Sequence, residues 1–585
     1  MHYYFFHGKG GVGKTTISSA FAVRFALEGK KILIVSTDPA SNLSDVFEQK
    51  IGSIEKKIEG FENLYAVEMD SDAEVLKYKQ KILGDSAEFL PEEVLNSIEE
   101  EFKSPCISEI AFFNSFTELF LKKDYDNIIF DTAPSAHTLR LLELPMEWTA
   151  YIDEVKKGAG QTCMGPVVNI DGYYNQYKIA LNGLKDPELT TFVFVMHPKE
   201  LDLLEIKNST EEVKKFGITN IEIIANAILP DELYLQAEFK NIIADQRKIL
   251  KQIDSMEFKT LKINLKKNEV KGLRSLVVFF SNLIDNSEED KITFTNNNVG
   301  IKQKNNELIK KITPQKTPFY LFFTGKGGTG KTVSSLLFGK YFADKGMKTL
   351  VVSTDYSGHI SKITGLENIG GIPAKSEDDD NLYFAGISPD SALDEYKKNT
   401  VEYFKSYSNN EQSLKVLKEE LNSPCTEEVA VFKKFSSFFF EYKDYDVIIF
   451  DAAPTGHALR LLYISLEYAK MDKKDARLEE FVKILKNTNK TIFSLCLYPE
   501  YSPIQEAKRA YDDLKAAGIN TSFLIVNYIL GSNFNNSFFN GRKKIQETYL
   551  EQVKQKFSIP LFTIPQYSGE INNQKTLDAL YSSVF

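Results

Sequence analysis

A phosphate-binding loop occurs twice in this chain, and each copy carries an extra lysine near its start. The copies read GKGGVGKT at residues 8–15 and GKGGTGKT at residues 325–332. Both fit the pattern G-x-x-x-x-G-K-[ST], and both follow a short apolar run, YYFF or FYLFF. A strand, a glycine-rich loop and a helix form the context in which backbone N–H groups cradle phosphate oxygens. The sequence therefore predicts two P-loops, each bound to a nucleotide, with ATP and Mg²⁺ as the cofactors.

The same positions in both loops supply the expected nucleotide contacts. Lys14 and Lys331 would reach the β- and γ-phosphates, and the hydroxyls of Thr15 and Thr332 would face Mg²⁺. The remaining predicted nucleotide-binding residues of the loops are Gly8, Gly10, Gly11, Gly13 and Thr16, and Gly325, Gly327, Gly328 and Gly330.

The repeat extends far beyond the loops, because DYDNIIFDTAPSAHTLRLL parallels DYDVIIFDAAPTGHALRLL and SPCISEIAFF parallels SPCTEEVAVF. Length alone allows about three or four domains. One long period instead indicates a single domain that was duplicated and fused. We expect an N-terminal domain at residues 1–285, a linker rich in Asn, Lys and Gln at 286–317, and a C-terminal domain at 318–585. A linker of about 30 residues allows the two domains to pack face to face.

Short apolar runs alternate with amphipathic stretches in both halves, for example KILIVSTD and DNIIFDTAP in the first and KTLVVSTD and DVIIFDAAP in the second. Nearly continuous apolar strands between helices indicate a parallel sheet that is covered on both faces. The predicted fold class is α/β: two homologous P-loop NTPase domains with mainly parallel sheets, fused as a pseudo-dimer. Each ligand site is expected at the carboxyl ends of the strands.

Composition excludes several function classes. The net charge of −10 argues against a nucleic-acid partner. The sequence contains no stretch of 18 or more apolar residues, so no membrane span is predicted. The four cysteines exclude a disulfide scaffold and fit a reducing cytosol. The N-terminus shows no cleavable signal pattern. We therefore expect a cytoplasmic protein.

Carboxylates end two apolar runs in each half. Asp38 and Asp355 would orient or deprotonate the attacking water, and Asp131 and Asp451 resemble Walker B carboxylates that hold Mg²⁺ through water. Each of the four could instead be a helix cap or turn former at the end of a strand.

The extra lysines, Lys9 and Lys326, lie too near the start of their loops to reach their own γ-phosphate easily. If the halves face each other, each lysine could stabilise charge on the opposite nucleotide, as an arginine finger does. A solvated loop lysine is the alternative. Asn226 and Asn527 end late strands, where an amide could pair with the adenine edge or simply form a turn.

Three cysteines are candidates for a soft-ion site. Cys106 and Cys425 are duplicates in S-P-C-x-x-E turns, and Cys163 lies on an insertion of about 20 residues that is specific to the first half. Three thiolates suit a soft ion. A lone cysteine is more often a small core hydrophobe, which fits Cys496 inside an apolar run.

The matched motifs resemble those of the arsenical pump-driving ATPase family, the soluble subunit of arsenite efflux systems. The resemblance covers nearly the whole chain, and STDPASNLSDVF and DTAPSAHTLRLL are similar to its switch I and switch II segments. It implies that Lys9 and Lys326 act across the domain interface and that Asp38 and Asp355 position water. It implies an As(III) or Sb(III) site at Cys106, Cys163, Cys425, His137 and His457, and adenine contacts at Asn226 and Asn527.

The resemblance implies a metalloid-stimulated ATPase that energises a membrane efflux subunit from the inner face of the membrane, with a metallochaperone as a candidate partner. The alternative is a targeting ATPase for tail-anchored membrane proteins, which shares the switch motifs. That family carries a C-x-x-C zinc motif, and this chain has none. Tyr356 replaces the switch I proline in the second half, and Asp45 has no acidic counterpart there. We therefore expect the first site to be the more competent.

Overall fold

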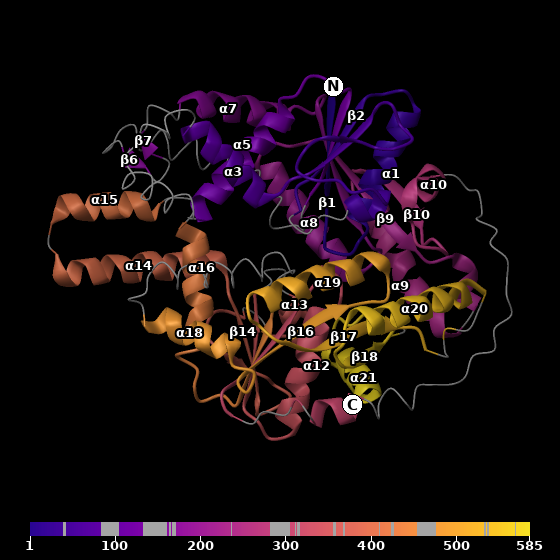
Figure 1. The fold of residues 1–585 in the computed structure, drawn as a ribbon. Coiled ribbons are helices and arrows are strands. Elements are labelled where there is room, and N and C mark those ends of the chain that lie inside the picture. The colour runs from indigo at the N-terminus through magenta and orange to yellow at the C-terminus, as the bar shows by residue number, and fades with distance from the viewer. Residues whose placement is uncertain are drawn as a thin grey trace.

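The chain folds into two α/β halves, each built on an eight-stranded sheet (Figure 1). We call them the first and second half. The computed structural model describes residues 1–38, 43–83, 105–132, 161–162, 165–166, 171–235, 237–280, 305–310, 312, 316–354, 359–366, 369–408, 410–422, 426–452, 476–531, 534, 537–567 and 569–585.

The two sheets have the same strand order. Within each, all neighbouring strands are parallel except for one short antiparallel edge strand. The first sheet runs β10 (Lys259–Asn264), β9 (Ile221–Ile228), β8 (Thr190–Met196), β1 (His2–His7), β5 (Asn127–Asp131), β2 (Ile32–Ser36), β4 (Leu64–Glu68) and β3 (Lys56–Lys57). The equivalent second sheet runs β18 (Leu561–Pro565), β17 (Thr521–Ile529), β16 (Thr491–Leu497), β11 (Phe319–Gly325), β15 (Val447–Asp451), β12 (Thr349–Ser353), β14 (Leu382–Gly386) and β13 (Ala374–Lys375). This confirms the predicted α/β class and the duplication.

Helices cover both faces of each sheet. In the first half, α1 (Lys14–Leu27) and α10 (Gly272–Val277) bury one face. The other face is buried by α5 (Pro105–Phe120), α7 (Asp171–Lys185), α8 (Glu200–Lys215) and α9 (Ala237–Asp254). The second half uses α12 (Lys331–Asp344), α13 (His359–Thr364) and α21 (Gln574–Val584) on one face, and α14 (Pro389–Tyr407), α16 (Thr426–Ser437), α18 (Ala476–Lys486), α19 (Tyr501–Ala516) and α20 (Ser537–Lys556) on the other.

The remaining elements are α2 (Leu43–Phe47), α3 (Ser71–Leu83), the 3₁₀ turn η3 (Asp231–Leu235), α15 (Glu411–Leu421) and a two-stranded hairpin of β6 (Gln161–Thr162) and β7 (Gly165–Pro166). In Figure 1, α14 and α15 project together from the second half. No helix within these described ranges is long and apolar enough to cross a bilayer.

Both cores contain the same aromatic stack on the central strands. Phe5 stacks on Phe130 and Phe192 at ring-centroid distances of 4.6 and 4.9 Å. Phe322 is the equivalent residue of the second half and stacks on its own two neighbours at 4.6 and 4.4 Å. Strands that are buried on both faces need apolar side chains at successive positions, which explains the continuous apolar runs in the sequence.

The halves meet along an interface that we call the seam. An apolar cluster from both halves lies there, and Phe239 of α9 stacks on Phe539 of α20 with centroids 5.0 Å apart and rings nearly parallel. The Arg542 guanidinium also donates to the Lys266 carbonyl at 2.7 Å. Most of the predicted linker lies outside the described residues. Within it, however, Leu308, Ile309 and Ile312 are buried in the core of the second half.

Candidate nucleotide site

Each P-loop leads directly into a helix, because α1 begins at Lys14 and α12 at Lys331. The residues before them, Gly13 and Gly330, have φ of 93° and 86°, which glycine adopts without strain. Their lack of a side chain is also a packing requirement. A Cβ atom on Gly13 would lie 2.6 Å from the amide nitrogen of Asn226. The loop thus aims the helix N-terminus, with its unpaired N–H groups, at the position where phosphate is expected.

The lysine of each loop folds back over its own backbone. Lys14 Nζ donates to the carbonyls of Gly8 at 2.7 Å and Lys9 at 3.0 Å. Lys331 makes the same two contacts at 3.1 and 3.2 Å. Burial lowers the pKa of Lys14, and the carboxylates of Asp131 and Asp38 oppose that change. A buried ammonium group gains from a nearby anion, so a phosphate is a fitting ligand at this position.

A hydroxyl and a carboxylate lie together beside each loop. Thr332 Oγ1 donates to Asp451 Oδ2 at 2.8 Å, and Thr15 hydrogen-bonds to Asp131 in the first half. Burial raises the pKa of Asp131 to about 6, and the hydrogen bonds from Thr15 and Ser18 oppose this rise. Asp131 Oδ1 is buried and accepts no hydrogen bond from any described residue. Hard oxygen donors of this kind fit a hydrated Mg²⁺ ion.

Asp38 lies next to the same group. It follows β2, whose Ser36 is the register neighbour of Asp131 on β5. The negative charge of Asp38 acts on both Lys14 and Asp131. The structure therefore brings together the P-loop lysine and both carboxylates of the first half. The equivalent Asp355 lies outside the described residues.

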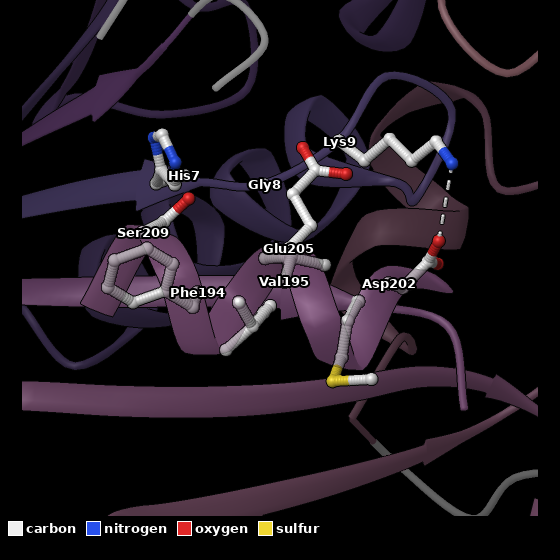
Figure 2. A pocket seen from close by; sticks show the side chains of 10 residues that line it. His7, Gly8, Lys9, Phe194, Val195, Asp202, Glu205 and Ser209 are labelled. Carbon is white, nitrogen blue, oxygen red and sulfur yellow. Dashed lines mark ion pairs between the residues drawn. The ribbon is translucent and has the colours of Figure 1, made fainter. Parts of the chain in front are cut away.

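The loop lysines Lys9 and Lys326 each contact a helix of their own half. That helix follows the strand that pairs with the P-loop strand in the sheet, β8 in the first half and β16 in the second. Lys9 Nζ lies 3.6 Å from Asp202 Oδ1 of α8. The dashed line in Figure 2 marks this ion pair. Lys326 Nζ donates to Ser502 Oγ at 2.5 Å and lies 3.8 Å from Glu506 Oε2, both on α19.

The charges of these lysines also act across the seam. The Lys326 charge contributes to lowering the pKa of Lys14, after burial, although Lys14 belongs to the first half. Burial raises the pKa of Tyr528 in the second half, and the Lys9 charge opposes that rise. Contact of either lysine side chain with the nucleotide of the opposite half remains a prediction.

The two P-loops touch each other at the seam. A Cβ atom on Gly10 would lie 2.3 Å from the Cα of Gly327, and one on Gly327 would lie 2.4 Å from the Cα of Gly10. Real Cβ atoms do not approach backbone so closely, so any side chain here would push the loops apart. Glycine at these two positions therefore allows the loops to meet, a role that the loop pattern alone does not predict.

Asn226 and Asn527 each support a P-loop from behind. Their side-chain amides donate to the carbonyl of Val12 at 2.8 Å and of Thr329 at 3.1 Å. The residue after each asparagine has a positive φ, 56° at Ala227 and 57° at Tyr528. These contacts put both asparagines beside the nucleotide loop, and their pairing with adenine remains a prediction.

Cys163, Cys425, His137 and His457 lie outside the described residues. The backbone of Cys106 belongs to the first turn of α5, and its side chain is likewise not described. Cys496 is 1% exposed in the core of the second half, and burial raises the pKa of its thiol to about 12. This confirms the prediction of a core cysteine. In the described ranges, no group of three or more His, Cys, Asp or Glu side chains could hold a metal ion.

Sequence reasoning did not identify the partners of the loop lysines. Asp202 has no acidic counterpart, because the equivalent position on α19 is Pro503. Glu506 does have a counterpart, Glu205, at the 301-residue spacing that separates Asn226 from Asn527. A search for matched acidic residues at this spacing would have found that pair.

Comparison with known proteins gives a consistent result. A family model described as anion-transporting ATPase matches residues 1–285, 319–468 and 463–584. The arsenical pump-driving ATPase of Escherichia coli is 32% identical over 588 residues, covering 97% of this chain and 96% of the relative. That of Acidiphilium multivorum is 32% identical over 586 residues with the same coverage. ATPase GET3A of Arabidopsis thaliana is 33% identical over 303 residues, covering 48% of this chain and 82% of the relative.

The family match spans both halves, and the two relatives named as pump-driving ATPases align along nearly their whole length. Together with the paired P-loops, these matches define the enzyme class. The chain therefore belongs to the anion-transporting ATPase family, and it is an ATP hydrolase.

Proposed function

We propose that this ATPase is stimulated by As(III) or Sb(III) and energises a membrane efflux subunit. The observation that carries the proposal is the contact of two nucleotide loops, Gly10 against Gly327, at the seam of a fused pair. A ligand that binds the two halves together more tightly than apart would shift the pair toward the closed arrangement. Closure and hydrolysis would then be coupled.

The residues of each half divide the work of hydrolysis. Lys14 would hold the β- and γ-phosphates, and Thr15 and Asp131 would hold hydrated Mg²⁺. When bound, Mg²⁺ would offset negative charge on the phosphates. Asp38 would orient the attacking water, and its position beside Lys14 and Asp131 supports that role. Lys331, Thr332, Asp451 and Asp355 would do the same in the second half.

Lys9 and Lys326 would approach the opposite nucleotide from the helix ends on which they rest, as the halves close. The small effect of the Lys326 charge on Lys14 of the first half supports this role. A lysine that contacts the phosphates only when the halves close would stabilise the charge that develops in the transition state.

The metalloid would be the substrate of a three-thiolate site made by Cys106, Cys163 and Cys425, with His137 and His457 beside it. The support is the duplicated S-P-C turn, the family match and the relatives that are named arsenical pump-driving ATPases and align over nearly their whole length. Thiolates prefer soft ions such as As(III) and Sb(III) over Mg²⁺. We further propose a cytoplasmic protein that binds peripherally to an efflux subunit, with a metallochaperone as the metalloid donor.

A steady-state ATPase titration tests the proposal. Antimonite and arsenite are expected to raise kcat, and a divalent control metal is not. Cys106→Ser should remove most of the stimulation and leave the basal rate intact, whereas Cys496→Ser, which changes a core cysteine, should keep the stimulation. A rate that is indifferent to both metalloids would overturn the metalloid assignment and leave the ATPase class intact.

A further inference from the structure

Each half contributes one glutamate that contacts a helix of the other half. Glu269 follows β10 and Glu570 follows β18, and their spacing of 301 residues marks them as equivalent positions. Glu269 Oε1 accepts a hydrogen bond from the Tyr501 amide at 3.1 Å. The Glu570 carboxylate accepts from the amides of Glu200 and Leu201, each at 3.3 Å. These amides are the first N–H groups of α19 and α8, so the contact is reciprocal.

In neither helix does the N-cap residue supply a cap with its own side chain. The residue before α8 is Lys199 and the residue before α19 is Glu500, and neither side chain makes a capping hydrogen bond. The first N–H groups of a helix need acceptors, and a carboxylate there also interacts favourably with the helix dipole. The acceptor for each helix therefore comes from across the seam. Glu269 is itself held in place by a hydrogen bond from the Tyr549 hydroxyl.

The capped turns are the ones that hold the loop lysines. On α8, Asp202 directly follows the capped Leu201 and pairs with Lys9 at 3.6 Å. On α19, Ser502 directly follows the capped Tyr501 and accepts from the ammonium of Lys326 at 2.5 Å. A continuous set of contacts thus joins each glutamate, through one helix end, to the loop lysine of the opposite half.

We propose that Glu269 and Glu570 are positioning residues for hydrolysis. Each glutamate fixes the helix end on which a loop lysine rests, and it can do so only while the two halves are in contact. This inference rests on the proposed role of the loop lysines in hydrolysis. Separation of the halves would remove the cap, loosen the first turn of the helix and release the lysine from its partner. The position of each loop lysine is in this way tied to the state of the seam.

A double-mutant cycle on the full-length chain tests the inference, with kcat and KM measured for Mg·ATP. Glu570→Ala should lower kcat by about fivefold, because loss of a helix cap loosens the turn that holds Lys9. KM should change by less than about twofold, since Glu570 caps α8 and is not among the residues expected to bind the nucleotide. Adding Glu570→Ala to Lys9→Ala should cost nothing further. Glu211→Ala, an exposed glutamate on the same helix, should match the unchanged chain.

Other results would contradict the inference. Suppose that Lys9→Ala lowers kcat, and that Glu570→Ala lowers kcat by the same factor with or without Lys9. The cap then serves stability alone. In that case the inference fails, and the proposed function stands. If Lys9→Ala keeps full activity, the role of the loop lysine fails first, and the inference with it. Glu570→Gln keeps one acceptor oxygen and should recover part of the loss. The pair Glu269 and Lys326 gives a second, independent cycle.

Discussion

At the scale of single residues, the two halves contact each other with opposite charges at equivalent positions. Asp45 of α2 pairs with Arg509 of α19 at 3.0 Å. The equivalent residue of α13 is Lys362, which lies 3.8 Å from Glu200 of α8. If two first halves met in this way, the acidic Asp45 would face Asn208, the counterpart of Arg509, and lose its ion pair. In the second switch segment, Lys362 thus replaces the acidic residue, and it forms an ion pair of opposite sign with the first half.

The ion pair of Asp45 gives a prediction with a definite pH dependence. Burial raises the pKa of Asp45, and the Arg509 charge opposes that rise. A carboxyl group whose pKa is raised on folding costs stability as the pH rises through that pKa. Arg509→Ala removes the opposing charge. Because the Arg509 side chain is half exposed and its charge is screened by solvent, we expect a loss of about 0.5–1 kcal/mol in the free energy of unfolding at pH 7.5.

The loss should shrink as the pH falls toward 4, because protonation of folded Asp45 removes the charge with which Arg509 pairs. Urea unfolding followed by circular dichroism at both pH values measures it. Adding Asp45→Asn to Arg509→Ala should restore most of the stability at pH 7.5, because no buried charge is then left without its partner. An equal loss at both pH values would contradict this account of the pair.

At the scale of elements, the sequence predicted the strands and both P-loops because local patterns determine them. Continuous apolar runs became β2, β5 and their equivalents, and each glycine loop leads into a helix. The resting contacts of the loop lysines were not predictable in the same way. Lys9 pairs with Asp202 about 190 residues later, and that partner is set by the packing of α8 rather than by a local pattern. The contact of Gly10 with Gly327 likewise depends on how the halves pack.

The contact of α9 with α20 supplies a prediction at this scale. Phe239 is 1% exposed and stacks on Phe539 across the seam. Phe239→Ala should lower the free energy of unfolding by about 3–4 kcal/mol, because it leaves a cavity in the shared cluster. Phe539→Ala should cost a similar amount, and the double variant less than the sum, since the two rings contact each other.

Urea unfolding of the three variants measures these losses. Tyr403→Ala, which changes an aromatic residue that is 71% exposed on α14, is the matched control and should have little effect. Additive losses for the two phenylalanines would show that the cluster does not couple the halves.

At the scale of the whole molecule, fusion makes the two halves non-identical partners in one chain. The seam combines an apolar cluster, touching P-loops, reversed ion pairs and reciprocal helix caps. Each of these contacts joins a residue of the first half to one of the second. We therefore propose that the chain closes as one unit, in which a lysine of each half completes the nucleotide site of the other.

The most direct test measures which lysine serves which site. Asp355→Asn should silence the second site, so that the remaining ATPase activity comes from the first. In that background, Lys326→Ala should lower the remaining activity by about a hundredfold or more, because the Lys326 side chain acts on the nucleotide of the first half. Lys9→Ala should largely spare it. If Lys9→Ala abolishes the activity and Lys326→Ala spares it, each lysine serves its own site, and the proposed action across the seam is contradicted.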